Sequence, residues 1–154
     1  MKIRPCKIRT ACWALALALV ACGHSSLFAQ AQKPDFSGEW QLDKEKSTRP
    51  DVVSETIDHR DPKVVITSAS ANGPGFTIWL TTDGKDNLNI IGGREMTAKT
   101  TWEGESLVTL VRDPNGMQFT EVRSLSEGGR VQTIEGFMDP GRKQAMFRRV
   151  MTRK

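Results

Sequence analysis

The sequence of 154 residues contains no tyrosine, only two histidines and only three cysteines. The cysteines, Cys6, Cys12 and Cys22, all lie near the start of the chain. A domain built from the residues after them has no disulfide bond and depends on its hydrophobic core for stability. About 120 residues are enough to form such a core as one domain.

The scarcity of histidine excludes several kinds of chemistry. His24 lies close to the start and His59 is the only other histidine, so a multi-histidine metal site is excluded. The G-x-S-x-G turn of serine hydrolases is absent, and the pairs Gly92-Gly93 and Gly128-Gly129 are typical of hairpin turns rather than phosphate loops. We therefore expect no enzyme, no metal and no cofactor, with His59 on the surface near a turn. An enzyme that uses paired carboxylates stays open, because acidic residues are numerous.

A long hydrophobic run is also missing. The apolar stretch Ala11–Ala21 has eleven residues, whereas a permanent membrane helix needs about 20. Basic residues without acidic ones precede it, and the small-residue pattern Ala29-Gln30-Ala31 follows it. This order predicts a secretion signal over residues 1–31, cleaved after Ala31, with a mature domain over residues 32–154.

A second route of processing is equally compatible with the sequence. Leu19-Val20-Ala21-Cys22-Gly23 resembles the bacterial lipobox, in which the cysteine receives lipid and becomes the new N-terminus. The signal would then span residues 1–21, and several acyl chains on Cys22 would attach the protein to a membrane. Both routes predict an extracytoplasmic protein, either periplasmic, secreted or membrane-anchored.

The mature domain carries no excess charge of either sign. Four of the 22 basic residues and none of the 18 acidic residues lie within residues 1–31, so the remainder has 18 of each. The basic whole-chain pI of about 9.1 therefore derives largely from the signal. We expect no nucleic-acid partner.

The mature domain shows short alternating segments separated by turn residues. No segment has a helical period of useful length. Such spacing predicts an all-β fold, a single antiparallel up-and-down β-barrel of about 8–10 strands. The expected strands cover residues 38–43, 52–59, 64–70, 76–82, 88–91, 95–102, 107–112, 117–125, 130–138 and 144–152, with a tight turn at Asp83-Gly84.

Charged residues fall on the apolar faces of two expected strands. Glu121 and Arg123 alternate in phase with Phe119, and Arg149 alternates in phase with Phe147. A fully packed interior would not hold these charges without a large energetic cost. The pattern fits a barrel with a solvated or ligand-filled cavity, or arginines on the outer face if the two faces are exchanged.

The first expected strand opens with Phe36-Ser37-Gly38-Glu39-Trp40, which resembles the G-x-W start of the calycins, the group that holds lipocalins and fatty-acid-binding proteins. The wider stretch 35–47 is similar to the start of secreted bacterial proteins, some labelled lipocalin-like. The resemblance implies that Gly38 permits a close approach of the chain and that Trp40 closes one end of a barrel. It also implies that an arginine of the last strand, Arg148, Arg149 or Arg153, packs on that tryptophan.

The second half resembles fatty-acid-binding proteins in three places. Residues 101–108 are similar to their strand-turn-strand with G-x-x-L-V character, residues 120–128 to their R-x-L-x-x-G strand, and Arg149-Val150-Met151 to their R-x-Y. The resemblance implies that Arg123 and Arg149 bind a ligand carboxylate inside the barrel. Met151 stands where the family has its tyrosine, which leaves carboxylate binding of that kind incomplete.

These observations favour an extracytoplasmic binding protein for a small hydrophobic or amphipathic ligand. The expected ligand residues are Arg123, Arg149, Phe119 and Trp79, although the aromatic side chains could equally fill the core. The alternative is a lipid-anchored or periplasmic structural module with a packed barrel, which interacts through its outer face and has no small-molecule ligand.

Overall fold

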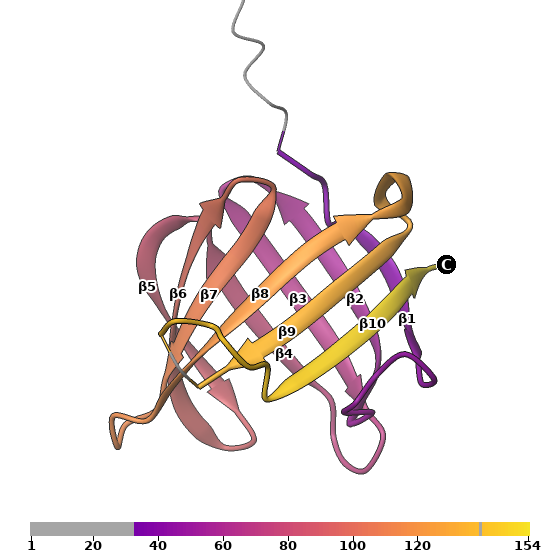
Figure 1. Ribbon diagram of the computed structural model, residues 1–154. Helices are drawn as coiled ribbons and strands as arrows, with labels where there is room; N and C mark the ends of the chain where they lie inside the picture. Colours follow the sequence, from indigo (N-terminus) through magenta and orange to yellow (C-terminus); the bar gives the residue numbers. More distant parts are fainter. Residues whose placement is uncertain (1–32, 139) are drawn as a thin grey trace, which may run out of the picture. The chain divides into compact units, whose positions relative to one another are not determined.

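The structure, a computed structural model, describes residues 33–138 and 140–154. The predicted signal, its cleavage after Ala31 and the lipidation of Cys22 concern residues outside this part of the chain. The described residues form ten strands and one short 3-10 turn, as the sequence predicts (Figure 1). The strands are β1 (Gly38–Asp43), β2 (Val52–Arg60), β3 (Lys63–Ser70), β4 (Phe76–Thr81), β5 (Asp83–Ile91), β6 (Arg94–Glu103), β7 (Ser106–Arg112), β8 (Gln118–Ser126), β9 (Val131–Phe137) and β10 (Phe147–Arg153), with the turn η1 (Glu127–Gly129) after β8.

The strands form one antiparallel sheet in the order β4-β3-β2-β1-β10-β9-β8-β7-β6-β5. Every neighbour in this order is also a neighbour in sequence except β1 and β10, which pair from Trp40 with Arg153 to Asp43 with Val150. The sheet curls into a nearly closed barrel, in which the yellow β10 lies beside β1 (Figure 1). The predicted up-and-down barrel is therefore confirmed.

Two strand boundaries differ from the prediction by more than one residue. Strand β5 begins at Asp83, so the tight turn expected at Asp83-Gly84 is wrong; the chain turns at Thr82, and the strand then carries an irregularity in register between Asp83 and Asp86. Gly84 has a φ of +76° there, a conformation that favours glycine, which explains why the residue pair resembles a turn in sequence. Strand β10 begins at Phe147, three residues later than expected.

One end of the barrel is filled around Trp40, whose side chain is fully buried. The indole Nε1 donates to the carbonyl of Phe36 at 3.0 Å, and the guanidinium of Arg153 lies 4.6 Å from the centre of the indole rings. Of the three arginines considered for this contact, Arg153 makes it. Gly38 has a φ of +129°, and a Cβ there would lie 3.2 Å from Nη1 of Arg153, so glycine permits the close approach.

The two end strands of the sheet, β4 and β5, meet along a seam that side chains hold together. The Asn89 side chain accepts a hydrogen bond from the Trp79 N–H at 2.7 Å and donates one to the Trp79 carbonyl at 3.0 Å. Oδ1 of Asn87 accepts from the Thr81 N–H at 2.8 Å. Asparagine amides thus take the place of main-chain partners for part of β4, because a side-chain amide offers the same donor and acceptor as a peptide group.

No helix in residues 33–138 and 140–154 is long and apolar enough to span a membrane.

Candidate functional site: a barrel cavity with a buried ion-pair network

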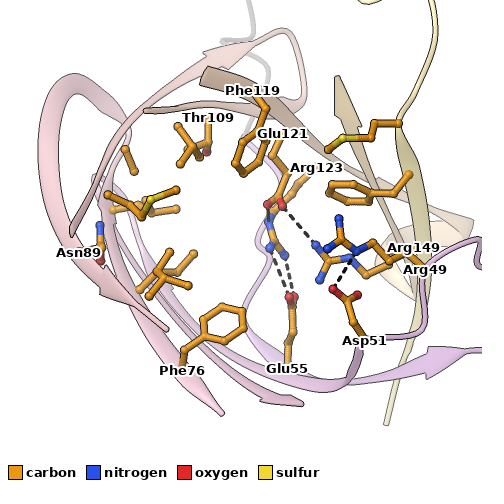
Figure 2. A pocket seen from close by; sticks show the side chains of 18 residues that line it. Arg49, Asp51, Glu55, Phe76, Asn89, Thr109, Phe119, Glu121, Arg123 and Arg149 are labelled. Atoms are coloured by element: carbon orange, nitrogen blue, oxygen red, sulfur yellow. Dashed lines mark hydrogen bonds and ion pairs between the residues drawn. The ribbon is translucent and has the colours of Figure 1, made fainter. Parts of the chain in front are cut away.

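A cavity of about 320 Å³ lies inside the barrel, at the end opposite Trp40. Its size is at the lower end of the range found for small-molecule sites. Figure 2 shows the side chains that surround it, with apolar groups on one side and charged groups on the other. The lining residues are Arg49, Asp51, Glu55, Phe76, Ile78, Leu80, Asn89, Ile91, Met96, Ala98, Thr109, Val111, Phe119, Glu121, Arg123, Met146, Phe147 and Arg149.

The apolar side of the cavity follows from strand alternation. Phe76, Ile78 and Leu80 occupy every second position of β4 and all line the cavity, as do Met96 and Ala98 on β6. Side chains at such positions point to one face of a sheet. The cavity therefore offers a continuous apolar surface that a hydrocarbon or ring system can contact.

Arg123 lies at the centre of the polar side. Its Nε donates to Glu121 at 2.8 Å, while Nη1 and Nη2 donate to the two carboxylate oxygens of Glu55 at 2.6 and 3.3 Å (Figure 2). The pair with Glu55 is bidentate, the arrangement that best matches a guanidinium to a carboxylate. The side chains of Arg123 and Glu55 are only 4% and 1% exposed, so the ion pair is screened from water.

This ion pair marks the boundary between the packed end and the hollow end of the barrel. Along β8 the inward positions are Leu125, which packs against the hydrophobic core, followed by Arg123, Glu121 and Phe119, which line the cavity. Gln132 of β9 is fully buried beside the pair and its Nε2 lies 3.4 Å from Glu55.

The electrostatic surroundings keep both members of the pair charged. Burial by itself would raise the pKa of Glu55, but the charge and hydrogen bonds of Arg123 outweigh it and hold the pKa below its ordinary value of 4.5. Desolvation would lower the pKa of Arg123, and the carboxylates of Glu121 and Glu55 together raise it above its ordinary range. At neutral pH the network therefore contains a carboxylate and a guanidinium, not a neutral pair.

Arg149 lies next to this network, nearer the mouth. Its Nη2 is 3.5 Å from Glu121, and its guanidinium lies 4.8 Å from the centre of the Phe147 ring. Arg49, from the β1–β2 connection, lies 5.5 Å from the same ring and forms an ion pair with Asp51 at 3.0 Å. The cavity thus reaches the end of the barrel at which β1 and β2 are joined.

The structure brings three of the four expected ligand residues together. Phe119, Arg123 and Arg149 all line the cavity, which assigns both arginines to the inner face of the sheet rather than the outer. Trp79 does not join them: it is 56% exposed and alternates out of phase with the cavity residues of β4. Only the main chain of Trp79 lies near the cavity, where its N–H and carbonyl form hydrogen bonds with the side chain of Asn89.

His59 lies elsewhere and is not a surface residue, so that expectation is wrong. Its side chain is 5% exposed and packs against the rings of Phe36 and Trp102, at 6.1 and 5.8 Å between ring centres. Its Nδ1 accepts a long hydrogen bond from the Phe36 N–H at 3.3 Å. The available signal was strand alternation, because His59 stands two residues after the buried Ile57 and shares its face; it was missed because His59 directly precedes a turn.

Sequence reasoning placed Glu121 on the same face as Arg123 but missed Glu55, the acidic partner of Arg123 on another strand. Glu55 was not distinguished from other acidic residues, although it alternates in phase with Ile57, which is buried in the core. That phase relationship was the available signal, and it points to an interior carboxylate that must be paired.

Comparison with known proteins supports the fold without supplying a family. No family model matches the chain, and no curated protein matches its sequence. Among solved structures, a REP1-NXSQ fatty acid transporter superposes with a TM-score of 0.61 at 14% identity, over 78% of this chain and 96% of the transporter. A variant of that transporter gives the same TM-score and identity over 98% of its length. A variant of the fluorescent protein UnaG gives a TM-score of 0.61 at 13% identity, over 77% of this chain and 96% of its own. The ten-stranded, nearly closed antiparallel barrel with its buried tryptophan therefore has the calycin-like fold of these solved structures.

Proposed function

We propose that this protein binds a small hydrophobic or amphipathic molecule inside the barrel. The observation that carries the proposal is the cavity of about 320 Å³, with an apolar lining on one side and buried charged groups on the other. Apolar burial would supply most of the affinity, and the polar side would fix the orientation of the ligand. The fatty acid transporter with the same fold is named for a cargo of this chemical kind. A module that interacts only through its outer face would not require a cavity in its interior.

Filling the cavity should abolish binding. In Ala98→Phe the added ring projects from β6 into the cavity, because Ala98 is buried and lines it. We expect an uncharged fluorescent probe, N-phenyl-1-naphthylamine, to bind the wild-type protein and to lose at least ten-fold in affinity in the variant. Fluorescence titration measures the effect, and a thermal melt establishes that the variant is folded.

Leu110→Phe is the matched control, since Leu110 belongs to β7 but lies on the outer face, away from the cavity lining. It should bind the probe as the wild type does. Equal binding by the wild type and Ala98→Phe would place the probe outside the barrel and contradict the proposal.

We further propose that the protein works outside the cytoplasm. The supporting observation is the order of basic start, eleven-residue apolar run and A-x-A pattern within residues 1–31. Denaturing mass spectrometry of the protein from its own cell envelope tests this location. A mass that begins at Gln32, or at a lipid-bearing Cys22, supports export, and a mass that retains residues 1–31 contradicts it.

A further inference from the structure

The polar side of the barrel cavity is electrically balanced before any ligand enters. Three guanidinium groups line it, and three carboxylates line it with them. Each arginine has a carboxylate partner within 3.5 Å. The six residues are Arg49, Arg123 and Arg149, with Asp51, Glu55 and Glu121.

Arg123 is already held by two carboxylates. All three of its guanidinium nitrogens donate to Glu55 or Glu121, and its side chain is 4% exposed. A ligand carboxylate that approached it would have to displace one of these carboxylates or lie beside them. Like charges that share a buried site disfavour ionisation, so an anionic ligand would meet repulsion here.

Arg149 differs from Arg123 in this respect. Its Nε–H is buried and has no hydrogen-bond partner among the described residues, and its contact with Glu121, at 3.5 Å, is at the limit of a hydrogen bond. The side chain is 9% exposed and lines the cavity. A buried donor without a partner is unusual in folded proteins, because it is satisfied only when a water molecule or a ligand accepts its hydrogen bond. Oδ1 of Asp51, also on the cavity wall, is a buried acceptor without a partner.

We infer that the cavity selects an uncharged amphipathic ligand, whose polar group accepts a hydrogen bond from Arg149, in preference to the corresponding fatty carboxylate. The inference rests on the proposed function and adds the chemical class of the ligand. An alcohol or amide head group supplies a neutral acceptor for the Arg149 Nε–H and also a donor for an acceptor such as Asp51. It adds no charge to a site that is already balanced. Its hydrocarbon part would contact Phe76, Ile78 and the other apolar residues.

Three ligands with the same ten-carbon chain test the selection. Decan-1-ol, decanoate and decylammonium are compared at pH 8 by their displacement of N-phenyl-1-naphthylamine from the wild-type protein. We expect decan-1-ol to displace the probe at a concentration at least ten-fold lower than either charged molecule. Stronger displacement by decanoate or by decylammonium would overturn the inference.

A charge-removing variant then tests whether Glu121 causes the discrimination. Glu121→Gln leaves the arginines with one positive charge in excess, so the affinity for decanoate relative to decan-1-ol should rise at least ten-fold. Glu135→Gln is the matched control, because Glu135 pairs with Arg148 at 4.0 Å outside the cavity lining, and it should leave the ratio unchanged. An unchanged ratio in Glu121→Gln would also overturn the inference.

If the proposed binding function itself is wrong, the same experiments give different results. In that case the probe binds the wild type and Ala98→Phe alike, or none of the three ten-carbon ligands displaces it. If decanoate displaces the probe at a lower concentration than decan-1-ol, the proposed binding function still stands and only the inference about the charge of the ligand is overturned.

Discussion

Replacing Arg123 with methionine is expected to lower the free energy of unfolding by about 3–5 kcal/mol, as measured by urea denaturation at pH 7. The side chain lies at the boundary between the packed and hollow parts of the barrel and forms ion pairs with two carboxylates. Without it, the fully buried Glu55 keeps a negative charge with only the neutral side chains of Gln132 and Ser68 as hydrogen-bond partners. The loss would be a large fraction of the 5–15 kcal/mol that typically stabilises a domain.

The pH dependence of this loss identifies its cause. In the wild type the pKa of Glu55 lies below 4.5, so its contribution to stability is present above that pH and disappears as the pH falls through the folded-state value. In Arg123→Met burial dominates and raises the pKa of Glu55, so the variant regains stability as the pH falls. The difference between the two proteins should therefore shrink below about pH 5.

Two further variants complete the test of the ion pair. The double variant Arg123→Met with Glu55→Gln should recover part of the lost stability, because the uncompensated charge is gone. Arg148→Met removes an exposed arginine, 4.0 Å from Glu135, and should change the stability by less than about 0.5 kcal/mol. A loss in Arg123→Met that is independent of pH would show that packing, not charge, is responsible.

Replacing Trp40 with alanine is expected to lower the free energy of unfolding by about 3–5 kcal/mol. The indole is fully buried, donates to the carbonyl of Phe36 and packs against the guanidinium of Arg153. The variant should nevertheless retain its affinity for the probe wherever it is folded, because Trp40 does not line the cavity. Urea denaturation and fluorescence titration of the same sample measure both quantities.

Trp79→Ala is the matched control for Trp40→Ala. This tryptophan is 56% exposed on the outer face of β4, so its removal should reduce stability by less than about 1 kcal/mol. Equal losses at the two positions would contradict the assignment of Trp40 as the side chain that fills the closed end of the barrel.

The sequence was sufficient to predict the strands and which residues share a face, but it left open which face points into the barrel. Alternation in β8 assigned Phe119, Glu121 and Arg123 to one face, and the structure places all three on the cavity. Such patterns are local, since side chains two residues apart share a face whatever the strand later pairs with. The first strand was predicted with its correct bounds, Gly38–Asp43, for the same reason.

The partners of these residues could not be predicted in the same way. Glu55 and Arg123 are 68 positions apart in the sequence, and only the closure of the sheet brings them within 2.6 Å. The hydrogen bonds between asparagine side chains of β5 and the main chain of β4 likewise form only in the closed barrel. Trp79 was expected at the ligand because aromatic rings are common in cavities, yet alternation alone would have assigned it to the face opposite Phe76 and Ile78.

The pairing of β1 with β10 also has a consequence for the order in which the protein can fold. The two strands pair residues that are far apart in the sequence, such as Gln41 and Thr152, which are 111 positions from each other. All other pairings link strands that are consecutive in the chain, so they can form as hairpins while the polypeptide is still emerging. One edge of β1 has no partner until the last seven-residue strand is complete. Until β10 has been synthesised, a nascent chain therefore exposes an unsatisfied strand edge on β1, a state that is prone to aggregation.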